Sequence, residues 1–298
     1  MTDAPGRPAP TMVEAYAAHW DSSRLDLDAY LRRVGHDGPL AADLATLTAL
    51  HRAHLAAIPF ENLDVILGRG VSVDLPDVAA KLVDRRRGGY CYEHATLFGA
   101  ALERVGFEVD RILARTGDPL EHPRPRSHAV LLVTSPTTGE RWLADVGFGS
   151  GLLAPLALVA DGPHTQGAWT YELVRGASAR DGAWRLRELQ ADGWATILTF
   201  TEEPMYPVDV EIANTNTATS PTSPFTQRPV LVLKDEARVR RLAGREHSIE
   251  GPGLETAREE YTDAQVAALL REVFGDALSA EDVDAVVASL PAMSGVTG

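Results

Sequence analysis

The chain has 298 residues and a formal net charge of −14, with 45% hydrophobic and 23% charged residues, a composition typical of a globular protein with more than one buried core. The acidic balance argues against a general nucleic-acid or anionic-membrane surface, and the single cysteine excludes an intramolecular disulfide and a C-x-x-C site. No apolar run approaches the roughly 20 residues that span a bilayer, and no signal-peptide pattern opens the chain, so we expect a cytoplasmic protein. The sequence also leads us to expect no bound metal.

The first third of the chain has helical periodicity. Apolar residues recur at three- and four-residue spacing over residues 12–67, which predicts several helices. A short helix is predicted over residues 78–83. A longer amphipathic helix is predicted to follow Cys91 and to extend as far as Val105.

The middle of the chain changes to short runs of β-branched, leucine and aromatic residues, which Gly, Pro, Asp and Thr separate. This pattern favours an antiparallel sheet or a small barrel. The predicted strands cover residues 109–115, 129–133, 141–146, 169–174, 184–189 and 194–200.

The C-terminal part has mixed periodicity. A strand is predicted over residues 230–233 and a helix over 263–274, with Thr262 as its N-cap and Gly275 just beyond its end. A last short helix is predicted over residues 280–290. Because the sequence contains no flexible linker, we expect the helical, β and mixed parts to pack as one body.

The single cysteine is a candidate nucleophile. A lone cysteine is more often a buried, inert small hydrophobe. Here Gly88 and Gly89 precede Cys91 and a predicted helix follows it, which places the thiol near a helix N-terminus, where negative charge is favoured. The arginines at 85–87 add positive charge, so the thiolate should be stabilised. The glycines also let backbone N–H groups approach the sulfur, where they would form an oxyanion hole.

A thiol nucleophile needs a general base, and the base needs a third group that fixes its orientation. Among the nine histidines, His128 opens a predicted strand, and the next predicted strand contains Asp145. If these strands pair as a hairpin, the two side chains lie opposite or nearly opposite, about 5 Å apart at Cβ. A buried aspartate in an apolar run needs such a partner. Cysteine, histidine and aspartate in this order indicate a catalytic triad; a His–Asp pair that only stabilises the hairpin is the alternative.

His94 is the main rival as the base, because it lies close after Cys91 in the same predicted helix. A cysteine at the start of that helix is expected to point its sulfur toward the sheet, away from the turn that carries His94. We therefore expect His128, and not His94, to act as the base.

Residues 86–94 read RRGGYCYEH, and this stretch resembles the active-site signature of the arylamine N-acetyltransferase family. Several linked motifs in one order are more specific than any single motif, and the resemblance covers roughly residues 12 to 275. The other similar segments are 58–63 (IPFENL), 126–128 (RSH), 143–149 (LADVGFG), 220–225 (SPTSPF) and 263–275.

The resemblance implies an α+β fold of three parts, with a triad arranged as in cysteine proteases. An N-terminal helical bundle over residues 1–107 would carry the cysteine. A central antiparallel β-barrel over 108–210 would carry the histidine and the aspartate, and an α/β lid would cover 211–298. This order agrees with the helical, β and mixed periodicity of the chain.

The resemblance also implies an acyltransferase with a ping-pong reaction. The Cys91 thiolate would attack acetyl-CoA, a co-substrate and not a bound cofactor, and an acetyl-cysteine would form as CoA leaves. An arylamine, arylhydroxylamine or hydrazine would then take the acetyl group. His128 would shuttle the proton, and Asp145 would orient His128 and stabilise its charged form.

Further residues receive roles from the same resemblance. It implies a structural ion pair between Glu61 and Arg87, and an acceptor pocket lined by Phe60 and Phe148. The residues that would border the channel for CoA are Tyr90, Thr222 and Phe225.

One position departs from the family pattern, because Ala95 stands where many members have asparagine. The same triad occurs in amide synthases of secondary metabolism, which take a larger acyl chain from an acyl carrier protein, and this role stays open as an alternative. A thiol hydrolase of the transglutaminase-like kind and a catalytically silent binding module are two further alternatives. Turnover without an amine would favour the hydrolase, and slow alkylation of Cys91 would favour the silent module.

Overall fold

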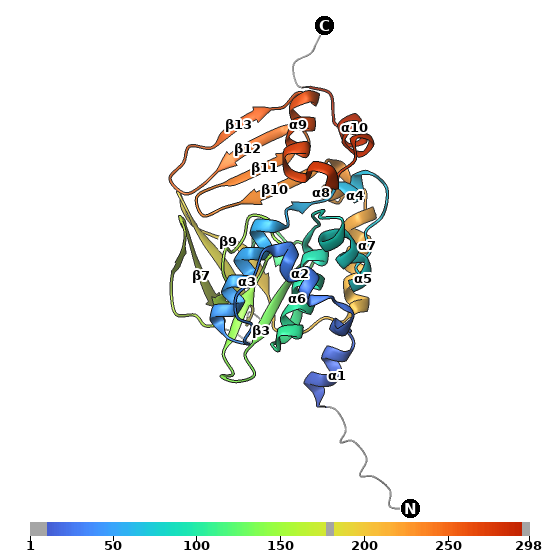
Figure 1. The fold of residues 1–298 in the computed structure, drawn as a ribbon. Coiled ribbons are helices and arrows are strands. Elements are labelled where there is room, and N and C mark those ends of the chain that lie inside the picture. The colour runs from blue at the N-terminus through green and yellow to red at the C-terminus, as the bar shows by residue number, and fades with distance from the viewer. Residues whose placement is uncertain (1–10, 177–181, 294–298) are drawn as a thin grey trace, which may run out of the picture.

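The computed structural model of the protein describes residues 11–176 and 182–293 (Figure 1). Its N-terminal part is helical, as the periodicity predicted. The helices are α1 (Met12–Ala18), α2 (Leu27–Val34), α3 (Leu44–Ala57), α4 (Leu63–Ile66), α5 (Leu75–Ala79) and α6 (Cys91–Val105), with a 3-10 turn at Ser22–Arg24 and a π-helical turn at Ala80–Asp84.

Side-chain caps set the ends of the first helices. Asp26 accepts a hydrogen bond from the backbone N–H of Ala29 at 2.9 Å and so begins α2. Asp43 accepts from the N–H of Thr46 at 2.8 Å and begins α3 in the same way. The chain leaves α2 through Gly35, whose φ of 71° is left-handed and therefore favours glycine.

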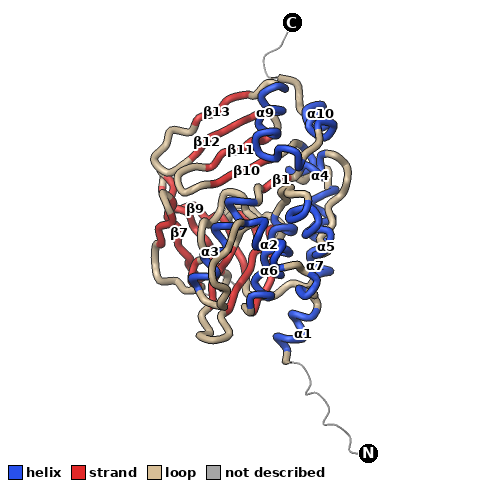
Figure 2. Tube along the Cα trace, in the orientation of Figure 1, coloured by secondary structure: helices blue, strands red, loops and turns tan. Residues whose placement is uncertain are grey.

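The middle of the chain forms an eight-stranded antiparallel sheet that curls into a nearly closed barrel (Figures 1 and 2). At the seam, the Gln166 side chain in β6 binds the backbone of Leu153 and Ala154, just ahead of β5. The strands lie in the sheet in the order β5-β4-β3-β2-β9-β8-β7-β6. In chain order they are β2 (Glu108–Thr116), β3 (His128–Thr134), β4 (Arg141–Ala144), β5 (Leu156–Ala157), β6 (His164–Gln166), β7 (Trp169–Arg175), β8 (Trp184–Gln190) and β9 (Gly193–Phe200).

The C-terminal part is a five-stranded antiparallel sheet on which α9 packs (Figure 2). Its first strand comes from the N-terminal part, because Phe60 pairs with Val232. The strands, in sheet order, are β1 (Phe60–Glu61), β10 (Val230–Lys234), β11 (Val239–Ala243), β12 (Glu246–Glu250) and β13 (Ala257–Glu260), followed by α9 (Asp263–Phe274), a 3-10 turn (Gly275–Ala277) and α10 (Ala280–Ala288). A core that includes Leu231, Leu242 and Leu270 joins this sheet to the helices.

Two helices that the sequence did not predict, α7 (Pro207–Thr219) and α8 (Pro224–Gln227), connect the barrel to the C-terminal sheet. Helix α7 binds back to the N-terminal part, because the Asn214 amide donates to the Val71 carbonyl at 2.8 Å. The domain boundary expected between residues 210 and 211 falls inside this helix. The barrel and the C-terminal sheet are therefore joined by a helix that also belongs to the helical part.

Each of the six strands predicted in the middle of the chain lies at an observed strand, whereas β5, β6 and β11 to β13 were not predicted. Strand β1 was not predicted either, because residues 12–67 were expected to be helical. Most predicted strand ends differ from the observed ones by a single residue at most, and the end of β4 differs by two. The strand expected over residues 141–146 ends at Ala144, because the Asp145 carboxylate accepts the N–H of Gly147 at 2.9 Å and turns the chain there.

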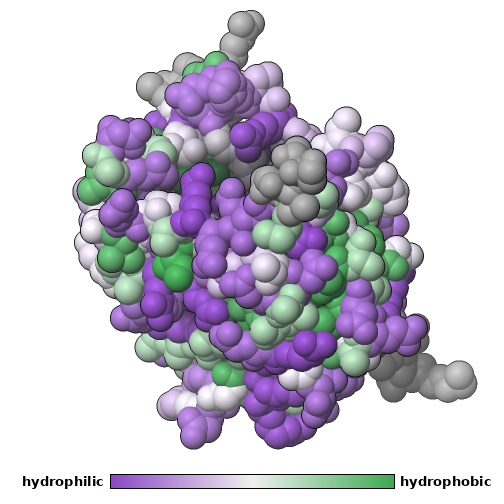
Figure 3. Space-filling view, turned by 90° about the horizontal axis from the view of Figure 1, so that it is seen from above, coloured by the Kyte–Doolittle hydropathy of each residue, from purple (hydrophilic) through white to green (hydrophobic). Residues whose placement is uncertain are grey.

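Hydrophilic residues cover most of the face seen from the side of the C-terminal sheet (Figure 3). Among the helices of residues 11–176 and 182–293, none combines the length and the hydrophobicity needed to cross a membrane.

Candidate active site

Cys91 is the first residue of α6 and is 3% exposed. Close approach to backbone requires glycine at position 88, and a side chain at position 89 would displace the Glu93 carboxylate. A Cβ atom on Gly88 would lie 2.2 Å from the carbonyl oxygen of Pro59, and one on Gly89 would lie 2.7 Å from the Glu93 carboxylate. The loop into α6 thus runs directly against its neighbours, and the first turn of the helix presents backbone N–H groups that lack helical acceptors beside the thiol.

His128 and Asp145 are hydrogen-bonded, with 2.8 Å between His128 Nε2 and Asp145 Oδ2. The predicted hairpin of β3 and β4 is present, and its last pair joins Leu131 and Ala144. Asp145 therefore follows the last paired residue and meets His128 diagonally. Its second oxygen accepts the N–H of Gly147, as described above, so both carboxylate oxygens are held.

Cys91 and His128, two members of the predicted triad, come together at the junction of α6 and the barrel. The Cys91 thiol lies 3.8 Å from the carbonyl oxygen of Ser127, the residue before His128. Gly147 also packs closely against Cys91, since a Cβ atom there would lie 2.9 Å from Cys91 Cα. Because the N–H of Gly147 also binds Asp145, the same turn holds the carboxylate and contacts Cys91.

The electrostatics of His128 favour its charged form. Burial lowers the pKa of His128, but the charge and hydrogen bond of Asp145 and the hydrogen bond with the Cys91 side chain outweigh it and raise that pKa to about 10. His128 and Asp145 are 4% and 3% exposed, so water screens their interaction little. The arrangement can hold an imidazolium beside the sulfur at neutral pH.

His94, the rival base, has no free ring nitrogen. Its Nε2 is 3.1 Å from the Gly89 carbonyl oxygen, and its Nδ1 is 2.9 Å from His54 Nε2. Burial lowers the pKa of His94 to about 4. This geometry supports the expectation that His128, and not His94, serves the thiol.

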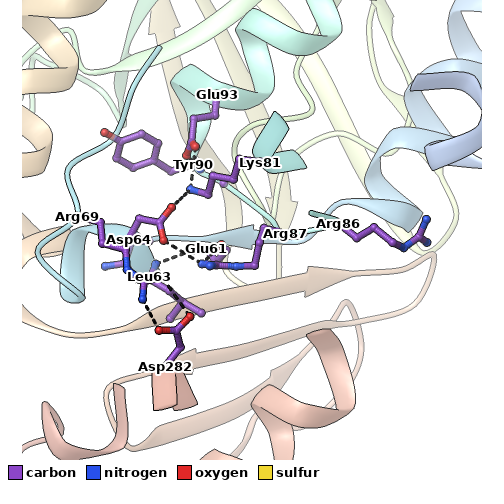
Figure 4. A network of polar contacts seen from close by, with 12 residues as sticks. Glu61, Leu63, Asp64, Arg69, Lys81, Arg86, Arg87, Tyr90, Glu93 and Asp282 are labelled. Atoms are coloured by element: carbon purple, nitrogen blue, oxygen red, sulfur yellow. Dashed lines mark hydrogen bonds and ion pairs between the residues drawn. The ribbon is translucent and has the colours of Figure 1, made fainter. Parts of the chain in front are cut away.

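The ion pair expected between Glu61 and Arg87 is present beside the nucleophile loop (residues 86–90, which lead to the proposed nucleophile Cys91); 2.8 Å separate Arg87 Nη2 and Glu61 Oε1 (Figure 4). Arg87 also pairs with Asp64 at 3.3 Å. Figure 4 shows Arg86 pointing away from this network. The sequence predicted that these arginines stabilise the thiolate. Instead, the charge of Arg87 is balanced by Glu61 and Asp64, and the side chain of Arg86 points away from this network.

A second part of the network reaches α6 itself. Lys81 binds Asp64 at 2.9 Å and Glu93 at 2.8 Å, and the other oxygen of Glu93 accepts the N–H of Tyr90 at 3.1 Å (Figure 4). Burial raises the pKa of Glu93 to about 7, against the opposing effect of Lys81. Lys81 and Asp64 were not predicted, and the only local signal for this network is Glu93, an acidic residue in the first turn of α6.

Of the two residues expected in the acceptor pocket, Phe148 contacts His128, with ring centroids 5.1 Å apart. Phe148 also lines a cavity of about 690 Å³ between the barrel and the C-terminal sheet, together with Trp169 and Arg241. Phe60 is buried and stacks on His94, with centroids 6.4 Å apart.

The residues expected along the CoA channel are spread over different environments. Tyr90 is fully buried and donates its hydroxyl to Asn214. Phe225 packs edge-on against Tyr90 at 5.9 Å, whereas Thr222 is exposed. Ala95, the departure from the family pattern, is 4% exposed within α6. Across the described ranges, no group of three His, Cys, Asp or Glu side chains could hold a metal ion.

Comparison with known proteins gives one consistent result. The N-acetyltransferase family profile matches residues 43–283. The arylamine N-acetyltransferase of Mycolicibacterium smegmatis is 39% identical over 277 residues, which cover 89% of this chain and 98% of that protein.

Solved structures agree with the sequence comparison. The arylamine N-acetyltransferase from Nocardia farcinica matches with a TM-score of 0.85 and 41% identity, covering 92% of this chain and 96% of that one. The Mycobacterium marinum enzyme in complex with CoA matches with a TM-score of 0.80 and 32% identity, covering 89% and 99%. The chain belongs to the arylamine N-acetyltransferase family and is an acyltransferase.

Proposed function

We propose that this enzyme moves an acetyl group from acetyl-CoA to an aromatic amine, hydroxylamine or hydrazine through an acetyl-cysteine at Cys91. The observation that carries the proposal is the buried hydrogen bond between His128 and Asp145 at 2.8 Å, with His128 also interacting with the Cys91 side chain. The relatives are named for arylamine N-acetylation, and the Mycobacterium marinum structure holds CoA.

In the first half-reaction, the Cys91 sulfur attacks the thioester carbonyl of acetyl-CoA. The new C–S bond forms as negative charge moves to the carbonyl oxygen, where backbone N–H groups in the first turn of α6 would stabilise it. The intermediate collapses, the bond to the CoA sulfur breaks, and His128 gives the leaving thiolate its proton.

In the second half-reaction, the amine nitrogen attacks the acetyl-cysteine. The His128 imidazole takes the proton that the amine loses, and the Cys91 thiolate leaves beside the imidazolium. Asp145 holds His128 in one orientation throughout and stabilises its charged form. Phe148, in contact with His128, is placed to pack against the ring of the acceptor.

Transfer to an amine is favoured over hydrolysis by the burial of the thiol. Cys91 is 3% exposed and lies at the start of α6, where the helix meets the barrel, so bulk water has little access to an acyl group on its sulfur. No feature of the described residues favours a carrier-bound acyl donor over acetyl-CoA.

The test is the intact mass of the protein after brief exposure to acetyl-CoA. Wild type should gain about 42 Da, and an arylamine should remove it, as a ping-pong route through one acyl-cysteine requires. Cys91→Ala should gain nothing, and Cys91→Ser controls for the loss of the thiol alone. A folded wild-type protein that gains no mass would contradict the proposed donor.

A further inference from the structure

Four groups form a continuous chain of hydrogen bonds inside the helical part and end at the nucleophile loop. Tyr30 on α2 lies 3.1 Å from His54 Nδ1 on α3, measured from its hydroxyl oxygen. His54 Nε2 lies 2.9 Å from His94 Nδ1 on α6, and His94 Nε2 lies 3.1 Å from the carbonyl oxygen of Gly89. The three side chains are at most 1% exposed, so the chain is sealed from water.

The hydrogen bond between His94 and the Gly89 carbonyl determines which group donates in every other bond of the chain. The carbonyl oxygen of Gly89 only accepts, so His94 Nε2 carries the proton. Neutral His94 then accepts at Nδ1, which places the proton of His54 on its Nε2. His54 Nδ1 accepts in turn, and Tyr30 donates its hydroxyl.

Both imidazoles are neutral in this arrangement. Burial lowers the pKa of His94 to about 4 and lowers that of His54 well below its usual value. The charged groups nearest His94 oppose each other, because Asp145 raises its pKa and Lys81 lowers it.

Two more neighbours of His54, His51 and Arg33, lower its pKa further. The rings of His54 and His94 are both neutral, and each of their ring nitrogens takes part in a hydrogen bond, an arrangement suited to fixing geometry.

The two histidines hold the backbone just before Cys91, at Gly89. The Gly89 carbonyl also accepts the N–H of Glu61 at 2.8 Å, so two donors from different elements hold it. Gly89 lies two residues before Cys91 in the loop that begins α6. The His94 ring stacks on Phe60 as well, so one side chain touches both the loop and a wall of the expected acceptor pocket.

We infer that His94 is a positioning residue for acyl transfer: the bond from its Nε2 to the Gly89 carbonyl orients the backbone that presents Cys91 to the thioester, and His54 keeps His94 in the required tautomer. This inference rests on the proposed role of Cys91 as the acylated nucleophile.

Two amide substitutions test the two ring nitrogens of His94 one at a time. In His94→Gln the side-chain amide can occupy the place of Nε2 and still donate to Gly89. In His94→Asn the amide lies near the place of Nδ1, so it can still meet His54 but cannot reach Gly89. Tyr30→Phe is the control for general destabilisation, because it removes a buried hydrogen bond at the far end of the chain.

The readout is the single-turnover rate of Cys91 acetylation at saturating acetyl-CoA, measured by intact mass, with the KM for acetyl-CoA and the melting temperature of each variant. We expect His94→Asn to slow acetylation by about 10- to 100-fold, since small misplacement of a reacting group has effects of this size, with little change in KM. His94→Gln should retain several-fold more of the rate than His94→Asn, and Tyr30→Phe should lower the melting temperature without a matching loss of rate.

A purely structural role predicts a different pattern, in which the rate follows the melting temperature across all three variants. That pattern, or equal rates for His94→Asn and His94→Gln, overturns the inference and leaves the proposed function standing. A wild-type protein that acquires no acetyl group overturns the proposed function and this inference with it.

Discussion

Asp145→Asn keeps the shape of the side chain and removes the charge that stabilises the His128 imidazolium. With Asp145 present, the pKa of His128 is raised from 6.5 to about 10, although burial opposes the rise. A neighbouring carboxylate typically shifts a pKa by about 1–3 units, so we expect the pKa of His128 to be lower in the variant than in wild type by about that range. Loss of the orienting carboxylate of a triad lowers turnover by about 10⁴-fold, and we expect acetylation to fall by a similar factor.

The same substitution changes how stability depends on pH. Since the folded-state pKa of His128 exceeds its ordinary value of 6.5, the interaction stabilises the fold fully below pH 6.5 and is lost as the pH rises through about 10. Removing one partner of a buried ion pair costs about 3–5 kcal/mol, and we expect the lower end because asparagine can still form a hydrogen bond.

The assay combines an NMR titration of the His128 ring, assigned with a His128→Gln variant, and urea unfolding at pH 6 and pH 10. Wild type should lose stability between these pH values, and Asp145→Asn should lose much less. An unchanged His128 titration in a folded Asp145→Asn protein would refute the assignment of the raised pKa to the carboxylate.

Three further predictions concern the surroundings of the triad. Gly88→Ala should lower the melting temperature strongly, because its Cβ would lie 2.2 Å from the Pro59 carbonyl oxygen; an unchanged melting temperature would contradict the close approach. Arg87→Met should destabilise the protein by about 3–5 kcal/mol in urea unfolding, since Glu61 is left charged and buried, and adding Glu61→Gln should restore part of the loss. Phe148→Ala should change selectivity among para-substituted anilines more than it changes the acetylation rate, and equal losses with every aniline would count against a role in the acceptor pocket.

Local signals explain which elements could be predicted from the sequence. Thr262 caps α9 through the N–H of Gln265, and Gly275 follows its last residue, so both ends of that helix were predicted correctly. The strands β11 to β13 were missed because they are rich in charged residues, as in AREE of β13, where most side chains are exposed. A half-buried antiparallel strand alternates apolar and polar residues, and β13 lacks this alternation.

In the candidate site too, local signals decided which residues could be predicted. Cys91, His128 and Asp145 could be found because the glycines, the strand start and the buried acid each leave a mark in the local sequence. The ion pairs of Lys81 with Asp64 and Glu93 could not be predicted, because they depend on how α4, the π-helical turn and α6 pack together. The local sequence indicates only that Glu93 lies in the first turn of α6.

Strand β1 has a consequence for how the enzyme is made. Phe60 bridges to Gly89 in the nucleophile loop on one side and pairs with Val232 of β10 on the other. The chain is synthesised from its N-terminus, so the helices and the barrel are made before β10. Until β10 is present, one edge of this short strand lacks its partner. The strand that borders the Cys91 loop is therefore completed only when the C-terminal sheet forms.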